Sequence, residues 1–115
     1  MPHDPSKLLH DILNSAQRIL TWTENRSLTE YECDQLLSDA VERNFVTIGE
    51  ALSRLVRVDA DVAAGLGNYP QIIGFPNVVV HGYDSLEHAI VWGIIQNELP
   101  RLTERARALL DESMS

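Results

Sequence analysis

The longest helical pattern in the sequence runs from Asp34 to Arg57, and it constrains the fold more than any other feature. The stretch contains no proline. Its apolar residues recur at spacings of three and four, which places them on one face of a helix. They are Leu36, Leu37, Ala40, Val41, Phe45, Ile48, Ala51, Leu52 and Leu55. The pattern predicts the longest helix of the protein, with one buried face.

Helix-start signals mark two more elements before this long helix. Asp4 followed by Pro5 is typical of an N-cap and a first-turn proline, and predicts a first helix that ends near Thr23. The tetrapeptide Ser27-Leu28-Thr29-Glu30 matches a capping box, in which the serine and the glutamate satisfy free backbone donors at a helix start. A second helix is therefore expected directly after the first one.

The region after the long helix is less regular. Residues 59–69 predict a short helical turn and a loop, because Gly65 and Gly67 break the helical period. Residues 72–80 end in three consecutive valines, which favour a strand, but they lie between two helical patterns. We predict a helix for this segment.

The last helix is expected over residues 85–112, and it contains a proline. Pro100 removes one backbone hydrogen bond, so we expect a kink or a split near Gln96 or Asn97. Together the patterns predict an all-α fold, an up-down bundle of four to five helices. The length of 115 residues suits a single domain over residues 1–115.

Charge and polar composition limit the kinds of site. With 17 acidic and nine basic residues the net charge is −8, which argues against a broad nucleic-acid surface. Arg101, Arg105 and Arg107 cluster, and we interpret them as complementing the dipole in the C-terminal half of the last helix rather than as an RNA-binding stripe. Cys33 has acidic neighbours, so we expect a partly buried structural residue and not a nucleophile.

Targeting signals are not evident in the sequence. No run of 18 apolar residues occurs, and residues 1–7 lack the charged and then apolar pattern of a secretory signal. We therefore expect a cytoplasmic protein that does not contact a membrane. His3, His10 and His88 have no ligand-like spacing, so neither a metal nor another cofactor is expected.

A polar pair stands out in the apolar segment 74–83. Asn77 and His81 are four residues apart, so on a helix they share a face, and the amide could orient the imidazole. A neutral imidazole can transfer protons near pH 7. A half-buried structural histidine at a helix end is the alternative for His81, and a core or interface aromatic is the alternative for Tyr83.

Three sequence blocks resemble the HepT-like branch of the HEPN superfamily, a group of ribonuclease toxins, over nearly the whole chain. The first block lies in the long helix, the second spans the polar pair, and the third lies in the last helix. The blocks are residues 39–44 with 48–51, residues 69–83, and residues 91–102. The resemblance implies a helical HEPN-like domain with its functional centre at Asn77, His81 and Tyr83.

The family motif joins an arginine to a histidine four to six residues later and to a tyrosine two positions beyond it. Here Pro76 occupies the place of the arginine, while Asn77, His81 and Tyr83 are in register. The resemblance implies a metal-independent endoribonuclease that acts as a homodimer on RNA. Arg43, or an arginine of the second subunit, is a candidate for the missing cation, and an ion pair with Asp39 or Glu50 is the alternative role for Arg43.

Tyr83 is similar to the tyrosine that a partner enzyme modifies in this family. The resemblance implies adenylylation of Tyr83 by a cognate minimal nucleotidyltransferase antitoxin, which silences the toxin by adding bulk and negative charge. Two functions remain open at this point. One is an RNA-cleaving toxin of a toxin–antitoxin pair. The other is a catalytically degenerate HEPN module that dimerises and binds a nucleotidyltransferase.

Overall fold

The computed structural model describes residues 4–67 and 85–114, and every element in these two stretches is a helix. In chain order they are α1 (Pro5–Thr23), α2 (Leu28–Cys33), α3 (Gln35–Val58), α4 (Ala60–Gly65), α6 (Ser85–Asn97) and α7 (Leu99–Met114). The predicted all-α fold is confirmed. The helix predicted at residues 72–80 lies outside the described residues.

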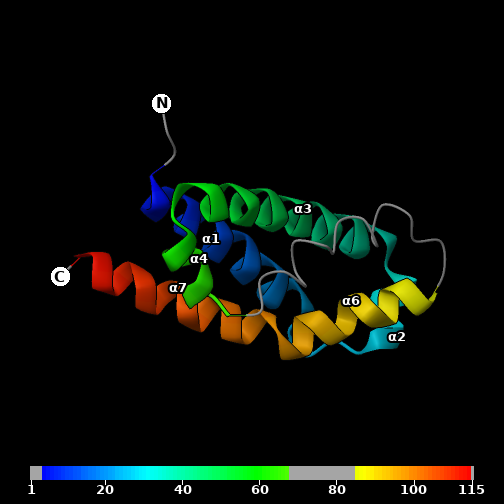
Figure 1. Cartoon of the computed structure of the whole chain (residues 1–115). Coiled ribbons are helices and arrows are strands. Elements are labelled where there is room, and N and C mark those ends of the chain that lie inside the picture. Colours follow the sequence, from blue (N-terminus) through cyan, green and yellow to red (C-terminus); the bar gives the residue numbers. More distant parts are fainter. Residues whose placement is uncertain (1–3, 68–84, 115) are drawn as a thin grey trace.

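Helix α1 is the centre of the packing. It contacts both α3 and α7, and it runs in the opposite direction to both of them (Figure 1). Helix α4 lies at the C-terminal end of α3, where it also contacts α7. The short helix α2 precedes α3 and contacts both α3 and α6. The described helices therefore have one long packed body and a separate meeting point of α2, α3 and α6.

The helix starts follow the predicted capping chemistry. Asp4 caps α1, since its carboxylate accepts a hydrogen bond from the backbone N–H of Ser6 at 3.0 Å. Both bonds of the capping box at Ser27 and Glu30 are present. Asp34 ends α2 and also caps α3 through a 3.0 Å bond from the Leu37 N–H. The boundary between the two helices is therefore set by one aspartate.

The apolar stripe predicted for the long helix contributes to the core, but Leu36, which was predicted on the buried face, is 82% exposed in the first turn of α3. Phe45, Ile48 and Leu52 of α3 are fully buried, as are Ile12 and Ile19 of α1. Helix α7 adds Leu102, Ala106 and Leu110 to the same cluster. At roughly 1.5–3 kcal/mol for each large apolar side chain, this burial is the main source of stability.

Pro100 divides the last predicted helix, as expected. Helix α6 ends at Asn97 and α7 begins at Leu99, so Glu98 is the break. The Thr103 hydroxyl donates to the Pro100 carbonyl at 2.8 Å and stabilises the new first turn. Because the helix restarts here, Arg101 lies near the start of α7, and no basic residue lies in its last turn. The predicted dipole role of the arginine cluster is therefore wrong.

Two further expectations have different outcomes. Cys33, the last residue of α2, is exposed, so the predicted partial burial is wrong. It ends a six-residue helix, where only Tyr31 turns into the core. As to membranes, none of the described helices has both the length and the apolar character needed to cross one.

Candidate functional site

The structure describes one of the four predicted site residues. Asn77, His81 and Tyr83 lie outside the described residues, whereas Arg43 is exposed on α3. Within the described part of the chain, no ion pair joins Arg43 to Asp39 or Glu50. The ion pair considered as the alternative role of Arg43 is therefore not formed.

A polar and aromatic cluster lies where α2, α3 and α6 meet. Its centre is Tyr31 of α2, which is fully buried. The His88 ring of α6 stands nearly perpendicular to the Tyr31 ring at a centroid distance of 5.5 Å. Trp92, one turn further along α6, approaches the same ring at 5.5 Å with a tilt of 37°. These edge and tilted contacts are favourable aromatic geometries, and they attach α2 to α6.

Among the described residues, the buried hydroxyl of Tyr31 has no hydrogen-bond partner. Burial is the main reason that the pKa of this phenol is raised, and the negative charges of Glu42 and Asp39 raise it further. The phenol therefore stays protonated at all ordinary pH values. An unpartnered buried hydroxyl costs about 1–3 kcal/mol, so this point of the fold is not optimised for stability.

Glu42 of α3 is the acidic member of the same cluster. Its side chain is half-buried, and burial raises its pKa, with a further increase from Asp39 one turn earlier on α3. The charge of His88 acts in the opposite direction and lowers the pKa of Glu42. Ionisable groups with perturbed pKa values tend to concentrate at functional sites.

The cluster is close in sequence to the predicted centre. Helix α6 begins at Ser85, directly after the segment that carries Asn77, His81 and Tyr83, and His88 is three residues inside it. In the sequence, His88 was considered only as a metal ligand, and that role was rejected. The four-residue spacing of His88 and Trp92, which places both rings on one face of α6, could have indicated a shared aromatic contact.

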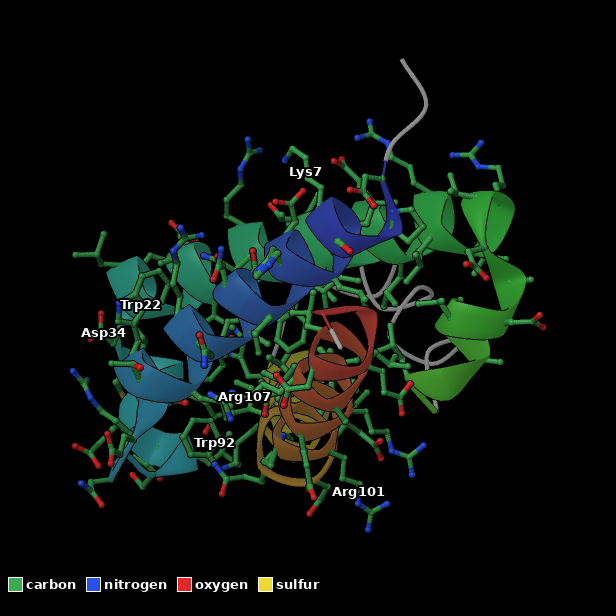
Figure 2. All side chains as sticks on the ribbon, turned by 90° about the vertical axis from the view of Figure 1, so that its left-hand side faces the viewer. Lys7, Trp22, Asp34, Trp92, Arg101 and Arg107 are labelled. Atoms are coloured by element: carbon green, nitrogen blue, oxygen red, sulfur yellow. The ribbon has the colours of Figure 1, made fainter. Side chains whose placement is uncertain are left out.

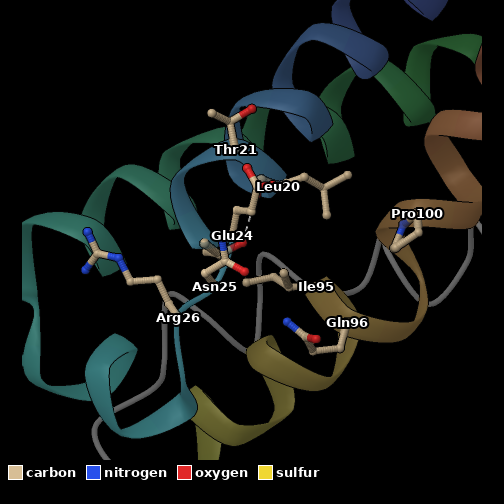
Figure 3. A pocket seen from close by; sticks show the side chains of 9 residues that line it. Leu20, Thr21, Glu24, Asn25, Arg26, Ile95, Gln96 and Pro100 are labelled. Carbon is tan, nitrogen blue, oxygen red and sulfur yellow. Dashed lines mark hydrogen bonds between the residues drawn. The ribbon is translucent and has the colours of Figure 1, made fainter.

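Two hollows of about 550 Å³ each lie around the C-terminal end of α1, away from this cluster. The first lies between the loop after α1 and the break between α6 and α7 (Figure 3). The second lies between α1 and the start of α3, beside Trp22 and Asp34 (Figure 2). Arg26 lines both hollows, but it is paired with Asp34 at 3.3 Å. Neither hollow thus offers a concentrated positive charge for a phosphate.

Metal-binding chemistry has no counterpart in the described residues. No group of three or more histidine, cysteine or acidic side chains there could hold a metal ion.

Comparison with known proteins decides the family. The profile described as "Ribonuclease HepT-like" matches residues 12–109. The chain belongs to the HepT-like ribonuclease family. The matched range includes the described helices from α1 to α7 and the segment with Asn77, His81 and Tyr83, so the resemblance seen in the sequence blocks is confirmed.

Individual relatives are similar over almost their full length. A protein of Methanocaldococcus jannaschii named "Putative RNase MJ1380" is 26% identical over 86% of this chain and 90% of its own length. A protein of Caldanaerobacter subterraneus subsp. tengcongensis named "Putative RNase TTE0752" is 23% identical over 94% of this chain and 96% of its own length. No solved structure matches significantly.

Proposed function

We propose that this protein is a metal-independent endoribonuclease, the toxin of a cytoplasmic toxin–antitoxin pair. The observation that carries the proposal is the family match over residues 12–109, a range that includes Asn77, His81 and Tyr83. In the proposed reaction a ribose 2′-hydroxyl attacks the adjacent phosphorus, and the bond to the 5′-oxygen breaks. His81 transfers the protons, and Asn77 orients its ring.

The reaction also needs a positive charge near the phosphate, and Pro76 cannot supply one. Arg43 is the candidate in this chain. It is exposed on α3, it has no ion pair within the described residues, and it directly follows Glu42 of the Tyr31 cluster. No direct partner among the described residues therefore neutralises its charge. An arginine of a second subunit is the other possible source.

We propose that the protein acts as a homodimer through the outer face of α6. This helix is apolar on nearly all sides, although a helix at the edge of a bundle normally has a polar outer face. Ala89 is exposed, Ile90 is 44% exposed, and a side chain added at Gly93 would meet nothing within 4 Å. A second copy that covers this face would bring two starts of α6 together, and with them two motif segments.

We propose that a minimal nucleotidyltransferase antitoxin silences the protein by adenylylating Tyr83. The phenol oxygen would attack the α-phosphorus of ATP, pyrophosphate would leave, and the phenol proton would pass to solvent. The added AMP brings negative charge next to the site where the RNA phosphate must bind. Mass spectrometry after incubation with the cognate enzyme and ATP should find AMP on Tyr83, and the Tyr83→Phe variant should remain unmodified.

A second candidate function follows from Pro76 and the net charge of −8. A chain without the motif arginine can serve as a non-catalytic module that dimerises and binds the nucleotidyltransferase. Losing one electrostatic donor to a transition state costs about 100- to 1,000-fold in rate, which is enough to abolish useful cleavage.

The decisive experiment compares four proteins on tRNA and on single-stranded RNA: the wild type, Arg43→Ala, Arg54→Ala and Pro76→Arg. If Arg43 supplies the cation, Arg43→Ala should lose about 100-fold in cleavage rate, and Arg54→Ala, an exposed arginine on the same helix, should lose nothing. If the chain is degenerate, the wild type should be inactive and Pro76→Arg should gain cleavage. Cleavage by the wild type that Arg43→Ala leaves unchanged would contradict both the role of Arg43 and the non-catalytic alternative.

A further inference from the structure

Among the described residues, two of the four large apolar side chains that remain exposed lie at one hollow. Trp22 of α1 is 38% exposed and Leu36 of α3 is 82% exposed, and both line the hollow of about 550 Å³ between these helices. Figure 2 shows Trp22 next to Asp34, which lines the same hollow. Apolar side chains that gather at a concave surface are typical of a binding site.

The charged groups at this hollow are mainly acidic. Glu24 and Asp34 line it together with one arginine, Arg26. Arg26 is paired with Asp34 at 3.3 Å, and its side chain is directed away from Ile95 (Figure 3). Glu24 is exposed, and no ion pair within the described residues neutralises it. The last turn of α1 has no basic residue, so the negative end of the helix dipole adds to this charge.

We propose that the hollow between α1 and α3 binds a segment of a partner protein in which a basic side chain stands next to a large aliphatic one. The aliphatic side chain would cover Leu36, and the basic one would lie over the Trp22 ring beside the Glu24 carboxylate. A tryptophan ring attracts a cation on its face through the ring quadrupole. This interaction surface goes beyond the proposed ribonuclease function and does not depend on it.

Other occupants fit these groups less well. Glu24 would repel the phosphates of RNA, and Arg26 is already paired with Asp34. A second copy of the chain carries a net charge of −8, which opposes an acidic surface. Arg18 lines a smaller hollow that also includes Trp22, so the acidic region is confined to the side of Glu24 and Asp34. A basic segment therefore matches this surface best.

An NMR titration of the ¹⁵N-labelled protein with short peptides tests the proposal. The probe is acetyl-Leu-Arg-Leu-Arg-amide, and the two control peptides carry glutamate in place of arginine or serine in place of leucine. The indole N–H of Trp22 and the amide of Leu36 should shift with the probe and much less with either control. The amide of Val58, an exposed apolar residue at the other end of α3, should not shift. No shift with the probe, or equal shifts with the glutamate peptide, would overturn the proposal.

Variants should change the affinity for the probe in opposite directions. Trp22→Leu keeps an apolar side chain but removes the ring, so it should weaken binding by about 2- to 5-fold. Glu24→Gln should weaken it by about 2- to 5-fold, whereas Arg26→Gln should strengthen it similarly, because the Asp34 carboxylate loses its partner. Val58→Ala is the matched control and should bind as the wild type does. Affinities that do not respond to Glu24 and Arg26, or that respond in the same direction, would overturn the proposal.

The other occupants predict different results. If RNA covers the hollow, tRNA should shift the Trp22 indole signal. If a second copy covers it, Leu36→Ala should lower the mass measured by sedimentation equilibrium, and because Leu36 is 82% exposed this variant should keep the fold. Either result would overturn the proposal, which expects an unshifted signal with tRNA and the wild-type mass for Leu36→Ala.

Discussion

The body formed by α1, α3 and α7 differs in kind from the meeting point of α2, α3 and α6. In the first region the buried side chains are nearly all aliphatic or aromatic, and its few buried polar residues include Thr23, whose hydroxyl donates to the Ile19 carbonyl at 2.8 Å. In the second region Tyr31 has an unpartnered hydroxyl, and Glu42 has a raised pKa. The first region therefore consists mainly of apolar contacts, whereas the second contains a buried hydroxyl and a carboxyl group in unfavourable surroundings.

The described groups with shifted pKa values lie close together in the structure. Among the described residues, Tyr31 and Glu42 are the groups with resolved pKa shifts, and both lie in the second region. That region adjoins the start of α6, where the motif segment ends. Functional sites commonly retain such unfavourable groups, because catalysis and recognition need them there.

The largest effect on stability should come from truncating a large buried side chain of the first region. Phe45 is fully buried in α3, so Phe45→Ala should lower the free energy of unfolding by about 3–5 kcal/mol. The matched control is Leu36→Ala on the same helix, since Leu36 is 82% exposed and its loss should change stability by less than about 0.5 kcal/mol. Urea unfolding followed by circular dichroism measures both. Similar losses at the two positions would contradict the assignment of the core.

In the second region the removal of one hydroxyl group should increase the free energy of unfolding instead of lowering it. Tyr31→Phe keeps the ring contacts with His88 and Trp92 but removes the unpartnered hydroxyl, so it should raise the free energy of unfolding by about 1–2 kcal/mol. The same urea titration measures this gain. A clear loss of stability would show that the hydroxyl has a hydrogen-bond partner in solution.

A smaller loss is expected at the capping box that starts α2. The Ser27 hydroxyl accepts a bond from the Glu30 N–H at 3.1 Å, so Ser27→Ala should cost about 1 kcal/mol. Thr29→Ala, an exposed position in the same helix, is the control and should cost nothing. If Ser27→Ala were neutral as well, α2 would be held by Tyr31 alone.

The smallest effect is the pH dependence that Glu42 gives to stability. Its pKa is raised above the ordinary value of 4.5, so the folded state holds this proton more tightly than the unfolded state does. The resulting stabilisation is complete below pH 4.5 and is lost as the pH rises through the raised pKa. The wild type should therefore gain stability relative to Glu42→Gln as the pH falls toward 4.5. The Asp39→Asn variant removes a charge that raises the pKa of Glu42. In this variant the pKa of Glu42 should be raised less, so the stabilisation should be lost over a narrower pH range.

The first region could be predicted from the sequence in detail. The period of three and four residues identified most of the buried face of α3, and the predicted start of α1 at Asp4 and Pro5 matches the structure. The break caused by Pro100 was also predicted, because a missing N–H has a local effect. Local rules of this kind depend only on neighbouring residues.

The second region could not be predicted in this way. Tyr31, Glu42 and His88 come from three helices, and only tertiary packing brings them together. The dipole role given to Arg101 failed for a different, local reason: the helix restarts at Leu99 beside Pro100, so Arg101 lies near the start of α7. For Asn77, His81 and Tyr83 the sequence resemblance remains the source of the assignment, and their roles stay predictions.

The central claim is that His81 transfers protons in RNA cleavage, and one rate comparison tests it directly. Purified wild type, His81→Ala and His10→Ala are incubated with the same tRNA, where His10 is an exposed histidine on α1. If His81 transfers the protons, His81→Ala should lose at least about 100-fold in the cleavage rate, while His10→Ala should keep the wild-type rate. Cleavage that persists unchanged in His81→Ala would contradict it.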